Sequence, residues 1–151
     1  MSGKNNLRFL ILTAALLAGC AKPNYADSKG GGEPNTQALG SCELKFESEN
    51  LCVSWAWENV ASTTQYGSFL LQTAFPQNQG LMLRAPAAEL KVLLWMPSMG
   101  HGSIPVQIEM VTPGLYRIKN VFFIMPGEWD LHFQLWNGGT KVDEATQRMI
   151  L

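Results

Sequence analysis

Residues 129–136 alternate strictly between two kinds of side chain, and this pattern constrains the fold more than any other in the chain. One set is Trp129, Leu131, Phe133 and Leu135, and the other is Asp130, His132, Gln134 and Trp136. Successive side chains of a strand point to opposite faces, so the pattern predicts an antiparallel strand with one buried and one solvated face. Asn137-Gly138-Gly139 is a hairpin signal, and 140–151 should form the next strand. We expect His132, on the polar face, to be exposed to solvent.

Further strand patterns, separated by turn residues, fill residues 41–151, which contain no amphipathic helical repeat of useful length. We predict strands at 42–46, 51–57, 68–75, 89–96, 105–111 and 115–125, the last being one strand or two broken at Asn120, and a short strand within 81–87. So many short strands over ~110 residues are typical of an all-β, immunoglobulin-like or cupredoxin-like antiparallel β-sandwich. Trp55 or Trp57, and Trp129, are expected to fill its core. The apolar run 92–96 is consistent with burial on both faces or with a functional strand end.

The first 19 residues have the pattern of a secretory signal. Lys4 and Arg8 form a basic start, and the apolar stretch 9–18 is shorter than the ~20 residues that a membrane-spanning helix needs. Leu17-Ala18-Gly19-Cys20 resembles a bacterial lipobox. This resemblance implies cleavage before Cys20 and attachment of lipid, such as palmitate, to that cysteine. Ordinary secretion is the alternative.

Residues 20–40 would then form the lipidated cysteine and a flexible tether, because they carry Gly30-Gly31-Gly32 and almost no large apolar side chain. The chain is therefore divided into a lipoprotein signal peptide at 1–19, the tether, and one domain at 41–151. The anchor would attach the domain to a membrane of the cell envelope, facing the periplasm. Ala21 favours the outer over the inner membrane under the sorting rule of enterobacterial lipoproteins.

Charge and cysteine content limit the partners further. The net charge is −1, and loss of 1–19 removes two bases and no acid, which gives −3. No basic patch remains for nucleic acid. In an oxidising compartment Cys42 and Cys52 are the pair left for a disulfide, which would join the first two strands. A thiolate metal site is the alternative, although no further cysteine is available to complete it.

Two methionines and a histidine are concentrated in the turn Trp95-Met96-Pro97-Ser98-Met99-Gly100-His101-Gly102, and Ile124-Met125-Pro126-Gly127 is a shorter echo of it. Thioether sulfur and neutral imidazole suit a cuprous ion better than calcium, magnesium or manganese. We therefore predict a site for cuprous copper formed by Met99 and His101, with Met96 or Met125 as a third ligand. The alternatives are core packing for the two methionines that end apolar stretches, Met96 and Met125, and a structural turn histidine that bonds a neighbouring carbonyl.

The chain also resembles a known family, the small periplasmic YtkA-like domains, which are related to FixH-like proteins. The matching segments are Leu94 to Gly102, Gly114-Leu115-Tyr116 and Phe122 to Leu131, within residues 85–136. The resemblance implies an immunoglobulin-like, non-enzymatic domain of the cell envelope. It also implies copper handling or assembly of copper oxidases, which is the role of some relatives.

Two functions follow from these patterns. The first is a lipid-anchored envelope domain that binds a cuprous ion weakly through the Met/His turn, and the second is a metal-free module that binds an envelope protein through exposed aromatic and methionine side chains. In the second case, Trp136 would be a contact residue. An enzyme is not expected, because no Ser-His-Asp spacing and no phosphate-binding glycine loop before a helix is found.

Overall fold

The computed structural model describes residues 39–151. The predicted signal peptide, the lipid attachment at Cys20 and almost all of the tether lie outside these residues. Within them, no helix is long and apolar enough to cross a membrane.

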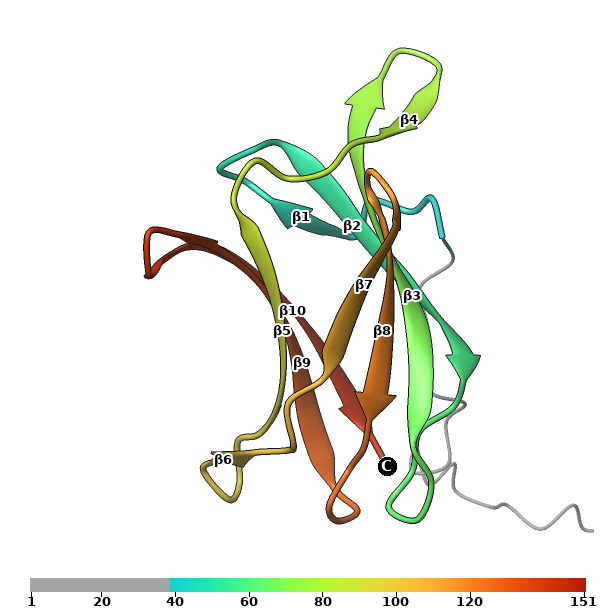
Figure 1. Cartoon of the computed structure of the whole chain (residues 1–151), viewed down its shortest axis with the longest axis vertical. Coiled ribbons are helices and arrows are strands. Elements are labelled where there is room, and N and C mark those ends of the chain that lie inside the picture. Colours follow the sequence, from blue (N-terminus) through green and yellow to red (C-terminus); the bar gives the residue numbers. More distant parts are fainter. Residues whose placement is uncertain (1–38) are drawn as a thin grey trace, which may run out of the picture.

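The described residues form two antiparallel sheets packed face to face (Figure 1). The strands are β1 Leu44–Phe46, β2 Leu51–Asn59, β3 Gly67–Gln77, β4 Gly80–Leu83, β5 Glu89–Met96, β6 His101–Gly102, β7 Gln107–Thr112, β8 Leu115–Val121, β9 Glu128–Asn137 and β10 Thr140–Ile150. Sheet A has the order β1-β2-β3-β8-β7, with β4 paired to β3, and sheet B has the order β10-β9-β5-β6. The predicted all-β, immunoglobulin-like sandwich is confirmed.

Aromatic side chains from both sheets fill the space between them. Trp55 on β2 and Trp129 on β9 are fully buried, as predicted, and Trp57 packs partly buried against the same core. Edge-to-face contacts join Trp55 to Phe69 at 5.2 Å and Phe123 to Trp129 at 5.3 Å between ring centroids. Burial of each such ring contributes roughly 1.5–3 kcal/mol by area alone, so the aromatic side chains stabilise the packing of the two sheets.

The β9–β10 hairpin confirms the alternation from which the fold was predicted. The four apolar side chains of β9 are completely buried, and Gly138 and Gly139 have φ of 56° and 85°. These positive values are what a tight hairpin turn requires and what glycine adopts at little cost. The chain can therefore reverse directly into β10, which covers the free edge of β9 (Figure 1).

Two segments differ from the sequence interpretation. The stretch 121–125 does not continue as a strand: β8 ends at Val121, and 122–127 is the connection that carries the chain from sheet A to sheet B. Asn120 stays within β8 at a φ of 58°. The apolar run 92–96 is not buried on both faces, because Leu93 faces outward and is 38% exposed while its neighbours on either side are buried.

The predicted disulfide between Cys42 and Cys52 is confirmed, with the two Cα atoms 4.7 Å apart. Cys52 lies on β2 and pairs with Lys45 of β1, so the bond fixes the short edge strand to its neighbour. A cross-link of this kind stabilises a fold by roughly 2–4 kcal/mol. With both sulfurs in the bond, the pair has no thiolate to offer a metal ion.

Candidate functional site

The predicted Met/His turn lies at one end of the sandwich, at the bottom of Figure 1. Strand β5 ends at Met96, residues 97–100 turn, and β6 returns antiparallel to β5. The turn is closed by two hydrogen bonds, because the backbone N–H groups of Met99 and Gly100 both donate to the Met96 carbonyl, at 3.2 and 3.0 Å. Gly100 adopts a φ of 67°, which explains why glycine suits this position.

Register places Met96 and His101 directly opposite each other on β5 and β6. Directly opposed residues of an antiparallel pair project from the same face. Since Met96 points into the core and is only 2% exposed, His101 lies on that inner face at the open end, where its side chain is half-buried. Its Nδ1 lies 3.3 Å from the carbonyl oxygen of Gly102. A proton on Nδ1 would point toward that carbonyl, leaving the Nε2 lone pair available.

The second methionine segment, the connection 122–127, meets the first. The Met96 methyl carbon lies 2.8 Å from the point where a Cβ of Gly127 would stand, so the methionine occupies the space that this glycine leaves open. Met125, two residues away, is half-buried against the core, and its carbonyl accepts a 3.1 Å hydrogen bond from Trp129 Nε1. The backbones that carry Met96, His101 and Met125 are therefore neighbours at this end.

A hydrogen bond outside the predicted motif also joins the two segments. The hydroxyl of Ser103, immediately after β6, donates to the carbonyl of Phe122 at the start of the 122–127 connection. Gly127 in turn exchanges backbone hydrogen bonds of 3.2 and 3.0 Å with Leu151. The end of the sandwich is thus held by hydrogen bonds between three segments that are distant in sequence.

Met99 differs from the other three predicted ligands. It lies at the tip of the 97–100 turn and is 57% exposed, whereas Met96 belongs to the buried core cluster. Residues 39–151 contain no group of three or more His, Cys, Asp and Glu side chains that could hold a metal ion.

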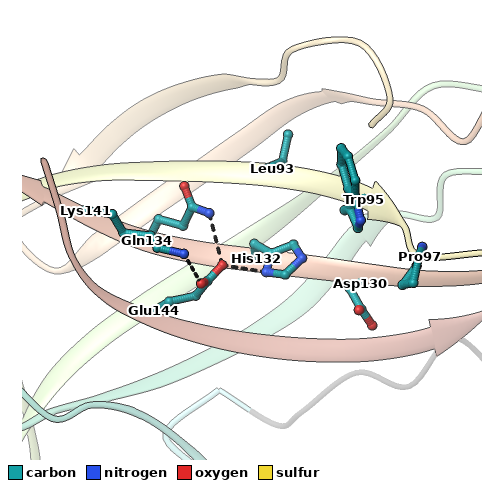
Figure 2. A pocket seen from close by; sticks show the side chains of 8 residues that line it. All are labelled: Leu93, Trp95, Pro97, Asp130, His132, Gln134, Lys141 and Glu144. Carbon is teal, nitrogen blue, oxygen red and sulfur yellow. Dashed lines mark hydrogen bonds and ion pairs between the residues drawn. The ribbon is translucent and has the colours of Figure 1, made fainter. Parts of the chain in front are cut away.

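A second region that could bind a ligand lies on the outer face of sheet B. A shallow pocket of about 450 Å³ opens there, across β5, β9 and the start of β10 (Figure 2). Its lining residues are Leu93, Trp95, Pro97, Asp130, His132, Gln134, Lys141 and Glu144. Sequence analysis did not identify this pocket, although the alternation along β9 correctly placed His132 and Gln134 on one face.

His132 is not simply exposed, contrary to expectation. It is half-buried, its Nδ1 lies 2.5 Å from Glu144 Oε1, and the Thr146 hydroxyl lies 3.1 Å from the same nitrogen. The reason is the hairpin partner: β10 places Thr146 opposite His132 and Glu144 one row further along. A polar face of one strand thereby becomes a hydrogen-bonded network once the neighbouring strand adds its own polar face.

Glu144 is the centre of this network. It accepts hydrogen bonds from Gln134 Nε2, at 3.0 Å, and from the Lys141 ammonium, and Gln134 Oε1 accepts one from Trp136 Nε1 at 3.0 Å. Burial alone would raise the pKa of Glu144, but the bonds from Lys141 and Gln134, together with nearby His132, outweigh it and lower the pKa. The carboxylate is therefore held ionised and in one orientation.

Asp130 lies at the other end of the pocket and is 7% exposed. Both of its oxygens are bonded by Arg148 of β10, at 2.8 Å from Nε and 3.1 Å from Nη2. Such a two-pronged contact fixes both side chains in place. The carboxylates at the two ends of the pocket are each neutralised by a basic residue of the protein.

Comparison of the sequence with models of protein families gives no match, and comparison with curated proteins gives none. The resemblance to YtkA-like domains stays a prediction.

Proposed function

We propose that this chain is a lipid-anchored, non-enzymatic domain of the bacterial cell envelope that binds a cuprous ion weakly and exchangeably at the end of the sandwich. His101 would be the nitrogen ligand, Met96 and Met125 the inner sulfur ligands, and Met99 a sulfur ligand from the solvent side. The single observation that supports this proposal most strongly is the opposition of Met96 and His101 on one face, with the Met96 methyl against the segment that carries Met125.

The donor set suits a soft, singly charged ion. Thioether and imidazole are neutral ligands, so a bound cuprous ion would add only one positive charge to a half-buried place, and harder divalent ions prefer oxygen. Met96 is held rigidly by the core, while Met99 lies on an exposed turn. An inner ligand that is fixed and an outer one that is free to move would favour transfer of the ion to a partner over permanent storage.

Competition with a chromogenic cuprous chelator, under anaerobic conditions, tests the site. We expect His101→Asn and Met125→Leu each to weaken binding by at least about tenfold, or ~1.4 kcal/mol. Met99→Leu tests the ligand on the solvent side. Met110→Leu is its matched control, since Met110 is similarly exposed, at 56%, but lies on β7. Equal affinity of wild type and the His101→Asn, Met125→Leu double variant would contradict the proposal.

A metal-free interaction module is the second candidate, and an apolar rim at the same end supports it. Exposed apolar side chains there come from three loops: Val60, Tyr66, Met99, Ile104 and Ile124. The Tyr66 ring lies 4.8 Å from that of Phe122, so the 60–66 loop and the 122–127 connection form one surface. Capture of one envelope protein with equal yield in the presence and absence of copper, lost in Tyr66→Ser with Ile124→Ser, would favour this function. Trp136 is not part of this rim.

A further inference from the structure

The outer pocket of sheet B is built by strand register, not by loops. β9 runs between β5 and β10, which places Leu93 beside His132 and Trp95 beside Asp130 in successive rows. On the other side of the Leu93 row, Gln134 lies between Lys91 and Glu144. Figure 2 shows Trp95 and Pro97 at one end of the pocket, His132 in the middle, and Gln134, Lys141 and Glu144 at the other end. Side chains held on paired strands in this way are already oriented before a ligand arrives.

The charges that line the pocket are balanced within the protein. Glu144 is bonded by Lys141 and His132, and Asp130 is bonded by Arg148. A strongly charged ligand would therefore find no unpaired opposite charge, and it would have to displace one of these contacts. This balance favours an uncharged ligand.

Polar atoms with remaining hydrogen-bonding capacity nevertheless face this pocket. Both contacts of the His132 ring use Nδ1, so Nε2 has no partner in the described part of the chain. Nε2 is therefore left for a hydrogen bond with a ligand, as acceptor or as donor according to the protonation of the ring. The Gln134 amide and the Lys141 ammonium each use one N–H on Glu144 and keep others. A ligand rich in hydroxyl groups, which both donate and accept, matches this mixture.

The remaining walls are apolar. Trp95 is half-buried and stands out from β5 at the end of the pocket, near Pro97, and Leu93 lies one row away beside His132 (Figure 2). A flat indole offers a surface for a ring that carries C–H groups on one face. The volume of about 450 Å³ lies within the range of roughly 300–1,000 Å³ that is usual for small-molecule sites.

We propose that this pocket binds an uncharged pyranose sugar unit, whose C–H face stacks on Trp95 while a ring hydroxyl forms a hydrogen bond with Nε2 of His132. The proposal is independent of copper binding, because the two regions share no ligand residue. The sugar unit can be a free monosaccharide or part of a longer neutral glycan, and the experiment distinguishes these sources.

Titration of the whole protein with glucose, galactose and mannose, and with their neutral hexamers, tests the proposal through the chemical shifts of the indole N–H signals. We expect saturable binding of at least one neutral sugar, with a hexamer bound more tightly than its monomer if the natural source is a glycan. Trp95→Ala and His132→Leu should each weaken binding at least about tenfold, and Trp95→Tyr should restore most of the loss. Matched controls are Tyr66→Ala and His101→Asn, which change an aromatic residue and the other histidine outside the pocket.

Several outcomes would overturn the proposal. These are no saturation by any of these neutral sugars at millimolar concentration, equal binding by Trp95→Ala and wild type, or saturable binding of glucuronate or inorganic phosphate in place of neutral sugars. Thermal unfolding of each variant shows whether a loss of binding reflects a loss of fold. If His101→Asn abolishes copper binding and leaves sugar binding intact, the two proposals stand separately. Failure of one leaves the other unaffected.

Discussion

The end of the sandwich and the outer face of sheet B are built in different ways. At the end, donor atoms come from two turns that are distant in sequence, and glycines at 100 and 127 allow those turns to close. On the outer face, three neighbouring strands supply the pocket, and side-chain hydrogen bonds fix it. The first region is rich in sulfur and apolar surface, and the second is rich in paired charge. One sandwich thus has thioether and imidazole donors on the turns at its end, and hydrogen-bonded polar side chains on the outer face of sheet B.

The two methionines of the turn should differ most clearly in their effect on stability. Met96→Ala is expected to lower the free energy of unfolding by about 2–5 kcal/mol, because it leaves a cavity in the core. Met99→Ala should change the free energy of unfolding by less than about 0.5 kcal/mol, because the side chain is exposed. Urea unfolding measures both. Similar losses for the two variants would show that Met99 packs as Met96 does.

A substitution at Gly127 tests whether copper binding and sugar binding are independent. Gly127→Ala should lower the free energy of unfolding by about 1–3 kcal/mol, since φ there is 139°, and should displace the Met96 methyl group. We expect a weaker cuprous affinity with unchanged sugar binding. Gly139→Ala is the control, because its φ is also positive, at 85°, but nothing lies within 4 Å of the added carbon. If both variants lose copper affinity equally, displacement of Met96 is not the cause.

The loss of stability in acid should report on Glu144 in the pocket. The pKa of Glu144 is lowered in the folded state from the ordinary value of 4.5. Its contribution is therefore fully present above that value and is lost as the pH falls through the lowered pKa. Urea unfolding between about pH 6 and pH 3 should show a shallower acid loss for Glu144→Gln than for wild type. An equally shallow slope in Glu43→Gln, an exposed carboxyl elsewhere, would contradict this assignment.

A small effect on stability is expected at the border of the pocket. The Lys91 ammonium lies 4.5 Å from the centre of the Trp136 ring. Lys91→Ala should lower the free energy of unfolding by about 0.5–1 kcal/mol and leave sugar affinity unchanged. A double-mutant cycle with Trp136→Leu isolates the pair. No coupling in that cycle would mean that the ring and the ammonium merely lie close together.

Part of both regions could be predicted from sequence. The bounds of β5 were predicted at both ends, and a turn was expected after it because Pro, Ser and Gly follow an apolar strand there. The structure limits this turn to 97–100 and adds the short strand β6, which was not predicted. Whether Met96 packs in the core or is free to bind a metal was left open by the sequence, and the structure shows that it is buried. The strand expected at 121–125 is a connection because the chain must change sheets there, which is a property of the topology.

The outer pocket shows where sequence reasoning ends. A simple hairpin from Asn137 to Thr140 would place Asp143 opposite Gln134, but a bulge between Lys141 and Asp143 shifts the register by one residue. Glu144 therefore stands opposite Gln134 and next to His132. Nothing in the local sequence pattern predicts this bulge, so the contact between His132 and Glu144 could not be predicted.

The sequence by itself determined most of the strands, the faces of β9, the hairpin turn and the Cys42–Cys52 bond. Each depends on local alternation, on glycine and proline, or on the lack of another cysteine partner in the domain. Only the tertiary structure decided which side chains meet: His101 with Met96, the 122–127 connection with Met96, and His132 with Glu144. The physical reason is that local conformation fixes the direction of a side chain, whereas its neighbours depend on the register and packing of segments far apart in the chain.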